Sequence, residues 1–135
     1  MTRKAENSFI AGLHEYVSCY YEKNNNPYRA GTPDVFYSGT KAPMWVEYKF
    51  VVVPKRDDTV IVPDLSPLQL YWLVKRRAEG RHVAVAVGCK EGGVLLQDPQ
   101  EWTSGLPASD FRSRLVSRRE LAAQIVRVTG PSPSS

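Results

Sequence analysis

Long apolar runs are missing from this sequence of 135 residues. No stretch approaches the roughly 20 consecutive apolar residues that a helix needs to cross a bilayer, so we expect no membrane association. The first seven residues, MTRKAEN, also lack the apolar segment of a secretory signal peptide. These absences argue against secretion and predict a cytoplasmic protein.

Cysteine is scarce as well, since the chain has only Cys19 and Cys89. Two isolated cysteines match no zinc-finger spacing and are too few for a disulfide framework. Reduced thiols are therefore expected, as in most cytosolic proteins. No internal repeat is visible, and the length is that of one ordinary domain.

Apolar residues are plentiful enough for a packed core, because 42% of the sequence is hydrophobic. The charge is basic, with 18 Lys and Arg against 14 Asp and Glu, a formal net charge of +4. Such a balance favours polyanionic partners through counterion release, although many basic proteins never bind nucleic acid. The basic residues gather in two groups, which are Lys75, Arg76, Arg77 and Arg81, and then Arg112, Arg114, Arg118 and Arg119.

An amphipathic helix is predicted from about residue 3 to residue 23, because apolar residues recur there at steps of three and four. Glu6 lies on the apolar stripe, so its carboxylate either points toward the core side or simply favours the dipole of the first turn. His14 departs from the stripe and is expected to be exposed. The stripe contains Phe9, Ile10, Leu13, Tyr16, Val17 and Tyr20.

Two β-rich runs follow, over 34–38 and 44–53, and we expect them to form an antiparallel hairpin. The polar stretch 54–64 is predicted to be an exposed loop that could act as a flap. Ser66 and Pro67 suit the start of a second helix, which Gly80 ends.

The second half of the chain contains an apolar run, 82–88, that is typical of a buried central strand. A further strand is expected at 94–97, and a capping box at 117–120 predicts a final helix to about residue 128. The stretch around Trp102 shows no clear pattern. The order helix, strand, strand, helix, strand, strand, helix predicts a single α/β domain with a mixed β-sheet flanked by helices.

Three residues carry the chemistry that the sequence suggests. Glu47 and Lys49 are two residues apart on a predicted strand, so both project from one face. Pairing with the preceding strand can bring Asp34 beside Glu47. The alternative for Glu47 and Lys49 is a plain ion pair on a solvated strand face.

Neighbouring carboxylates repel one another, and a hard divalent cation such as Mg²⁺ relieves that repulsion. The backbone carbonyl of Tyr48 is placed to complete its shell. A metal ion activates water and stabilises charge on a phosphodiester, while Lys49 would hold or deprotonate the attacking water. The three residues therefore suit phosphodiester hydrolysis.

The surrounding motifs are more specific than these residues alone. They are Gly31, Pro33 and Asp34, then Glu47 and Lys49, and then Leu65, Ser66 and Gln69 at a helix start. This arrangement resembles the PD-(D/E)XK nuclease superfamily, and within it the VRR-NUC family, whose stand-alone members are viral and bacterial. The resemblance covers about 6–87 and implies a restriction-endonuclease-like nuclease domain over 1–129, followed by a flexible tail at 130–135. It also implies a bacterial cell or a phage-infected host as the setting.

The resemblance implies a role for each site residue. Asp34 and Glu47 would bind Mg²⁺ or Mn²⁺, Lys49 would be catalytic, and Gln69 would order the water or the lysine. Gln69 could instead only cap its helix or face solvent. Glu6 matches a helical acid that often completes the metal site. The stand-alone relatives look like Holliday-junction resolvases that act as homodimers, which implies cleavage of branched DNA at two symmetric positions.

Basic residues near these segments are expected to contact DNA phosphates, although any one of them could serve solubility alone. They are Arg29, Lys41, Lys55, Arg56, Lys75, Arg76 and Arg77. No helix-turn-helix or zinc finger is visible, so a DNA structure is expected as the target rather than a base sequence. Three alternatives remain open: a flap or duplex nuclease with the same metal site, a decayed nuclease that only binds DNA, and a domain with chance motif matches.

Overall fold

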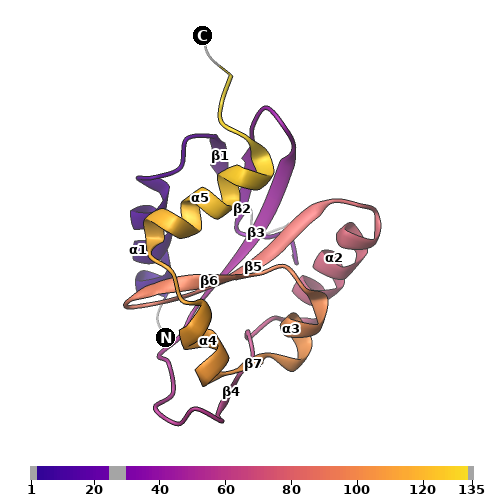
Figure 1. Cartoon of the computed structure of the whole chain (residues 1–135). Helices are drawn as coiled ribbons and strands as arrows, with labels where there is room; N and C mark the ends of the chain where they lie inside the picture. Colours follow the sequence, from indigo (N-terminus) through magenta and orange to yellow (C-terminus); the bar gives the residue numbers. More distant parts are fainter. Residues whose placement is uncertain (1–2, 25–29, 134–135) are drawn as a thin grey trace.

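The computed structural model describes residues 3–24 and 30–133 of the chain. A five-stranded mixed sheet forms its centre, with the strand order β1-β2-β3-β5-β6 (Figure 1). Its strands are β1 (Tyr20–Lys23), β2 (Val35–Ser38), β3 (Pro43–Phe50), β5 (His82–Cys89) and β6 (Gly92–Leu96). Only the β3–β5 pair is parallel. A short antiparallel pair, β4 (Val60–Ile61) and β7 (Leu106–Pro107), lies apart from this sheet.

Helices cover both faces of the sheet. One face packs against α1 (Arg3–His14) and α5 (Arg118–Thr129), whose buried residues include Phe9, Leu13 and Ile125. The other face packs against α2 (Pro67–Ala78), α3 (Pro99–Ser104) and α4 (Ala108–Arg114), which contribute Leu73, Trp102 and Phe111. The predicted mixed sheet flanked by helices is therefore confirmed.

The β2–β3 hairpin sets the position of the candidate site. Val35 lies opposite Val46, so Asp34, one residue earlier, is level with Glu47. β2 pairs only with the first half of β3, whereas β5 runs beside β3 as far as Phe50. The second half of β3 thus extends past the start of β2, between the α1 face and the α2 face.

The start and end of α2 follow from its sequence. Ser66 is the N-cap, its side chain accepts from the Gln69 backbone N–H, and the Gln69 side chain accepts from the Ser66 N–H in return. This capping box satisfies amide groups that a helix start leaves without intrahelical partners. Gly80 follows with a φ of 87°, a conformation that glycine adopts at little cost.

Three expectations about the elements are wrong. The first helix ends at His14, not near residue 23, and Tyr20 begins the edge strand β1. His14 is buried rather than exposed, with 9% of its surface accessible, because its ring lies beneath Tyr21 and against Tyr37. The expected order also lacked β1, β4, α3, β7 and α4, and β4 lies within the stretch 54–64 that was expected to be a loop.

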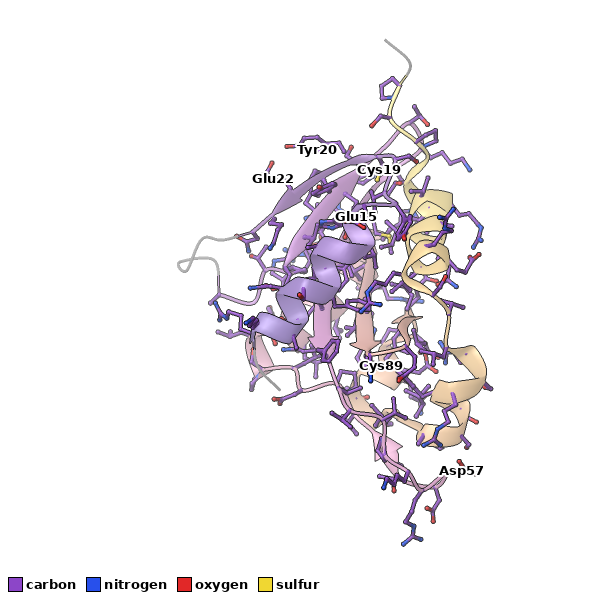
Figure 2. The ribbon with its side chains drawn as sticks, turned by 90° about the vertical axis from the view of Figure 1, so that its left-hand side faces the viewer. Glu15, Cys19, Tyr20, Glu22, Asp57 and Cys89 are labelled. Carbon is purple, nitrogen blue, oxygen red and sulfur yellow. The ribbon has the colours of Figure 1, made fainter. Side chains whose placement is uncertain are left out.

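The stretch 54–64 is tied to α4. The Arg112 side chain contacts the Asp57 carboxylate at 2.8 Å and the Pro54 carbonyl, and Ala108 N–H donates to Thr59 O at 2.8 Å. Asp57 lies at the outer tip of this stretch (Figure 2). These contacts with α4 and the β4–β7 pair hold the stretch against the domain at several points.

Both cysteines are free thiols, as expected. Cys19 lies just before β1 and Cys89 is the last residue of β5, and both are labelled in Figure 2. In the described part of the chain, no helix has the length and apolar character needed to cross a membrane.

Candidate active site

Asp34 is positioned by the loop that precedes it. Gly31 has a φ of 84°, and a Cβ atom there would lie 2.7 Å from the carbonyl oxygen of Leu68 in the first turn of α2. Only glycine permits both this conformation and this close approach. At the end of the loop, Asp34 Oδ2 accepts a hydrogen bond of 2.9 Å from the Tyr48 N–H. The glycine of the sequence motif therefore packs the Asp34 loop against α2.

Glu47 is the most buried carboxylate of the site, with 3% of its surface exposed. Its Oε2 accepts from Gln69 Nε2 at 3.1 Å and lies 3.5 Å from Lys49 Nζ. Its Oε1 is also buried, and no group in the described residues forms a hydrogen bond with it. A buried carboxylate oxygen without a partner is costly, and either a proton shared with Asp34 or a bound cation would satisfy it.

Burial raises the pKa of Glu47 to about 8, and repulsion from Asp34 adds to the effect. The Lys49 ammonium acts in the opposite direction, and Glu6 contributes a smaller increase. With both carboxylates ionised the site would carry an excess of negative charge, so below about pH 8 Glu47 keeps a proton. Such a site attracts a cation, which would compete with the proton on Glu47.

Gln69 joins the site residues of β3 to α2. Its Oε1 accepts from Lys49 Nζ at 3.3 Å and from the Ser66 N–H at 2.9 Å, while its Nε2 donates to Glu47. The Gln69 side chain caps its helix and also contacts the lysine. The amide holds Glu47 and Lys49 in fixed positions, and the Lys49 side chain remains 20% exposed.

Glu6 is near the site but does not join the carboxylate pair directly. Burial raises its pKa, Asp34 repels it, and Lys49 and Arg3 attract it, so α1 brings its charge within electrostatic reach of the site. Within residues 3–24 and 30–133, no group of three or more His, Cys, Asp and Glu side chains is arranged to hold a metal ion. The structure thus brings Asp34, Glu47, Lys49 and Gln69 together and leaves Glu6 outside.

The residues present fit a hard divalent cation. Mg²⁺ binds through one or two carboxylates with water in its remaining positions, and the unpartnered Glu47 Oε1 offers a ligand beside Asp34. The Tyr48 N–H points to the β2 edge, where it bonds to Asp34. Since the N–H and C=O of a strand residue point to the same edge, the Tyr48 carbonyl faces that edge too.

The basic residues of α2 lie toward its C-terminal end, whereas Gln69 lies in its first turn. Lys75 Nζ lies 5.8 Å from the centre of the Tyr71 ring. Arg76 pairs with Glu79 at 3.1 Å and Arg77 donates to the Gln97 carbonyl. Each of these three cations therefore contacts a neighbouring group of the protein, and all three lie toward the end of α2 that is farther from Gln69.

The other cations expected to bind DNA are dispersed. Lys55 and Arg56 lie in the exposed stretch after β3, where Arg56 pairs with Asp58 at 3.2 Å. Lys41 lies in the β2–β3 turn, at the end of the hairpin away from Asp34. Arg29 lies outside the described residues.

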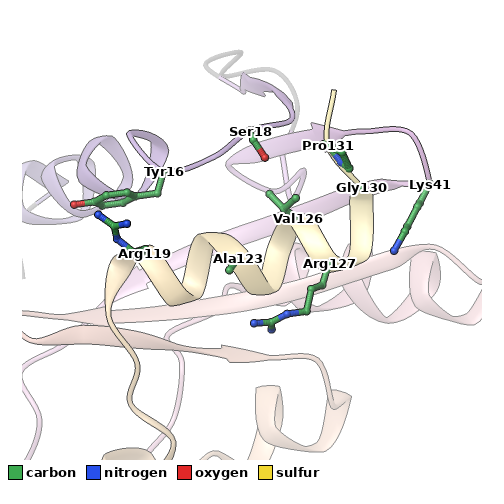
Figure 3. Close-up of a pocket in the computed structure, with 9 residues that line it drawn as sticks. All are labelled: Tyr16, Ser18, Lys41, Arg119, Ala123, Val126, Arg127, Gly130 and Pro131. Atoms are coloured by element: carbon green, nitrogen blue, oxygen red, sulfur yellow. The ribbon is translucent and has the colours of Figure 1, made fainter. Parts of the chain in front are cut away.

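Lys41 borders a hollow on the α5 side of the domain (Figure 3). Arg119 and Arg127 of α5 lie around the same hollow, and the Arg119 guanidinium is 4.9 Å from the centre of the Tyr16 ring. Pro131 closes one side, and its carbonyl accepts from the Thr40 N–H at 2.9 Å. Lys41 thus belongs to a basic surface separate from Glu47.

A buried hydrogen-bonded chain behind the site was missed by the sequence analysis. His14 Nε2 lies 2.7 Å from the Tyr37 hydroxyl, which lies 2.5 Å from the Tyr48 hydroxyl. These three hydrogen-bonded side chains join α1, β2 and β3, the elements that carry or adjoin Glu6, Asp34 and Glu47. Its signal was present, because Tyr37 and Tyr48 alternate with Phe36 and Glu47 and so occupy inward positions.

Neither a protein-family model nor a curated protein sequence matches this chain. Among solved structures, the chain is similar to Hjc of Archaeoglobus fulgidus, a Holliday junction resolvase from an archaeal hyperthermophile. The TM-score is 0.58 at 16% sequence identity, and the match covers 90% of this chain and 98% of that one. The chain therefore has the fold of that resolvase, a single α/β domain whose mixed sheet is flanked by helices.

Proposed function

We propose that this chain is a metal-dependent DNA endonuclease of the PD-(D/E)XK type that acts on branched DNA. The observation that carries the proposal is the buried Glu47 carboxylate, with an unpartnered Oε1, held beside Asp34 and Lys49 where β3 extends past β2. A plain surface ion pair explains neither the burial of Glu47 nor the Gln69 amide that contacts both charges.

The residues divide the work of phosphodiester hydrolysis. Asp34 and Glu47, with the Tyr48 carbonyl, would hold Mg²⁺ or Mn²⁺, which supplies an activated water and neutralises phosphate charge. Lys49 is positioned by Gln69 to orient the attacking water and to offset charge that develops on the phosphate. The Tyr48 N–H holds one Asp34 oxygen, so the other oxygen would be the one to bind the metal ion.

Branched DNA is supported as the substrate by the shared fold, since Hjc is named as a Holliday junction resolvase. The VRR-NUC resemblance of the sequence motifs favours the same class. A homodimer would supply two sites related by two-fold symmetry, which suits symmetric nicks in a four-way junction. Light scattering of the purified protein measures whether it is a dimer.

Cleavage of a panel of labelled DNAs tests the proposal. The panel contains a four-way junction, a flap, a single strand and a plain duplex, each incubated with Mg²⁺, Mn²⁺ or EDTA. We expect paired nicks in the junction that require the metal ion. Equal cutting of every duplex would contradict selectivity for branches, and tight binding without any cutting would favour a DNA-binding module that has lost catalysis.

A further inference from the structure

An apolar hollow of about 550 Å³ lies beside the candidate active site and has no role in the chemistry described above. Its volume is in the range of pockets that bind small organic groups. Four consecutive residues after Lys49 form much of its wall, and two cations border it. The residues that matter for its chemistry are Phe50, Val51, Val52, Val53, Lys90 and Arg118.

Two elements lead from the candidate site to the hollow. Phe50 directly follows Lys49 on β3, and Ala5, which also borders the hollow, directly precedes Glu6 on α1. Phe50 projects from the face of β3 opposite to Lys49, so the link between hollow and site is the start of α1, where Ala5 borders the hollow and the Glu6 charge acts on Asp34 and Lys49. A DNA strand that crosses this end of β3 beside Glu6 would bring a neighbouring nucleotide to the hollow.

The walls suit a flat, uncharged ring rather than a phosphate. Val52 is 74% exposed, which is unusual for a valine, and Phe50 is only partly buried against Phe9. The charges at the rim suit a phosphate, because Lys90 and Arg118 outnumber Glu91 there. An apolar wall with cations at its rim is the arrangement by which proteins bind the bases and backbone of single-stranded DNA.

We propose, resting on the proposed function, that this hollow binds one unstacked nucleobase of the strand held at Lys49. The base lies against Phe50 and Val52, and the adjoining phosphate lies near Arg118 or Lys90. A paired base cannot enter, because the complementary strand covers its edge and its neighbours cover its faces. The hollow would thus select DNA with an unpaired or easily unstacked nucleotide beside the cut.

The test compares two labelled strands by fluorescence anisotropy without added divalent ions, so that neither is cut. One is a ten-nucleotide thymidine strand, and the other has the same length and charge but consists of abasic units. We expect the wild-type protein to bind the thymidine strand about five-fold more tightly or better, the usual effect of one stacked base. Val52→Asp should reduce the ratio of the two affinities toward one. Its added negative charge weakens the binding of both strands equally, so the charge alone does not change the ratio.

Val62→Asp is the matched control, since Val62 is also exposed but does not border the hollow. It should retain the wild-type ratio. Equal affinity of the wild-type protein for both strands would overturn the base site, as would equal ratios in the two variants. Failure of the proposed nuclease function is read separately, as absence of metal-dependent cleavage. Metal-dependent cleavage without a preference for the thymidine strand would overturn only the proposal that the hollow binds a base.

Discussion

The Gln69 side chain donates to Glu47 Oε2 at 3.1 Å while it accepts from Lys49 Nζ at 3.3 Å. One neutral amide therefore contacts both the buried carboxylate and the ammonium of the site. It can do so because the capping box fixes Gln69 in the first turn of α2. A helix cap and the contacts to both charged groups are combined in a single side chain.

Replacing Gln69 by alanine should lower the rate of DNA cleavage by about 10–100-fold, the usual loss when a group that orients a metal ligand is removed. The variant also loses a helix cap, which costs about 1 kcal/mol of folding stability. Cleavage rate and unfolding free energy are measured on the same preparation.

Ser66→Ala is the control for that variant. It removes the hydroxyl that accepts from the Gln69 N–H but leaves the contacts to Glu47 and Lys49 in place. We expect the same loss of stability with cleavage within about three-fold of wild type, a rate change of less than 1 kcal/mol. An equal loss of cleavage in both variants would mean that Gln69 acts only through its helix.

The Tyr37 hydroxyl should contribute strongly to stability. Tyr37→Phe leaves His14 Nε2 and the Tyr48 hydroxyl without their buried partner, so we expect a loss of about 2–3 kcal/mol in the free energy of unfolding. Urea denaturation measures it. Tyr20→Phe removes an exposed hydroxyl bonded to Glu22 and should change stability by less than about 0.5 kcal/mol. Similar small effects in both variants would contradict the role of the buried chain.

Acid should destabilise the protein partly through His14. Burial, with a smaller contribution from Lys23, lowers the pKa of His14 from 6.5 to about 4. Between these two values the unfolded chain binds the proton more readily than the folded one, so stability is present above pH 6.5 and is lost as the pH falls toward 4. We expect His14 to account for about 1–3 kcal/mol of this loss.

Unfolding of His14→Gln across the same pH range checks that expectation. The variant has no titrating ring at this position, so its stability should depend less steeply on pH between 6.5 and 4. His82→Gln changes the exposed histidine and should keep the wild-type slope. A slope in His14→Gln that equals the wild-type slope would refute the assignment.

Much of the fold followed from the sequence, because local patterns determine its central elements. The run 82–88 is apolar on both faces and forms the buried interior strand β5, and Ser66 with Gln69 specified the start of α2. β1 was missed because Tyr20 continues the helical spacing of the apolar stripe, although its strand pairing with Ser38 depends on residues distant in sequence. The short helices α3 and α4 are held by the packing of Trp102 and Phe111, which no local pattern specifies.

In the candidate site, too, local patterns predicted some residues and tertiary packing determined others. Asp34, Glu47 and Lys49 were expected together from strand alternation and hairpin pairing, and the register brings Asp34 level with Glu47. Burial of His14 depends on Tyr21 and Tyr37, which reach it through tertiary packing, so its position on α1 was a misleading guide. The distance of Lys41 from the site follows from the length of the hairpin.

The catalytic role of Lys49 is the central claim, and single-turnover cleavage of a four-way junction by Lys49→Ala tests it most directly. Lys41→Ala removes the same charge at the far end of the hairpin and is the matched control. We predict a loss of about 1,000-fold or more in Lys49→Ala with little change in junction affinity, and a rate near wild type in Lys41→Ala at saturating protein. Cleavage by Lys49→Ala within ten-fold of wild type would contradict the account.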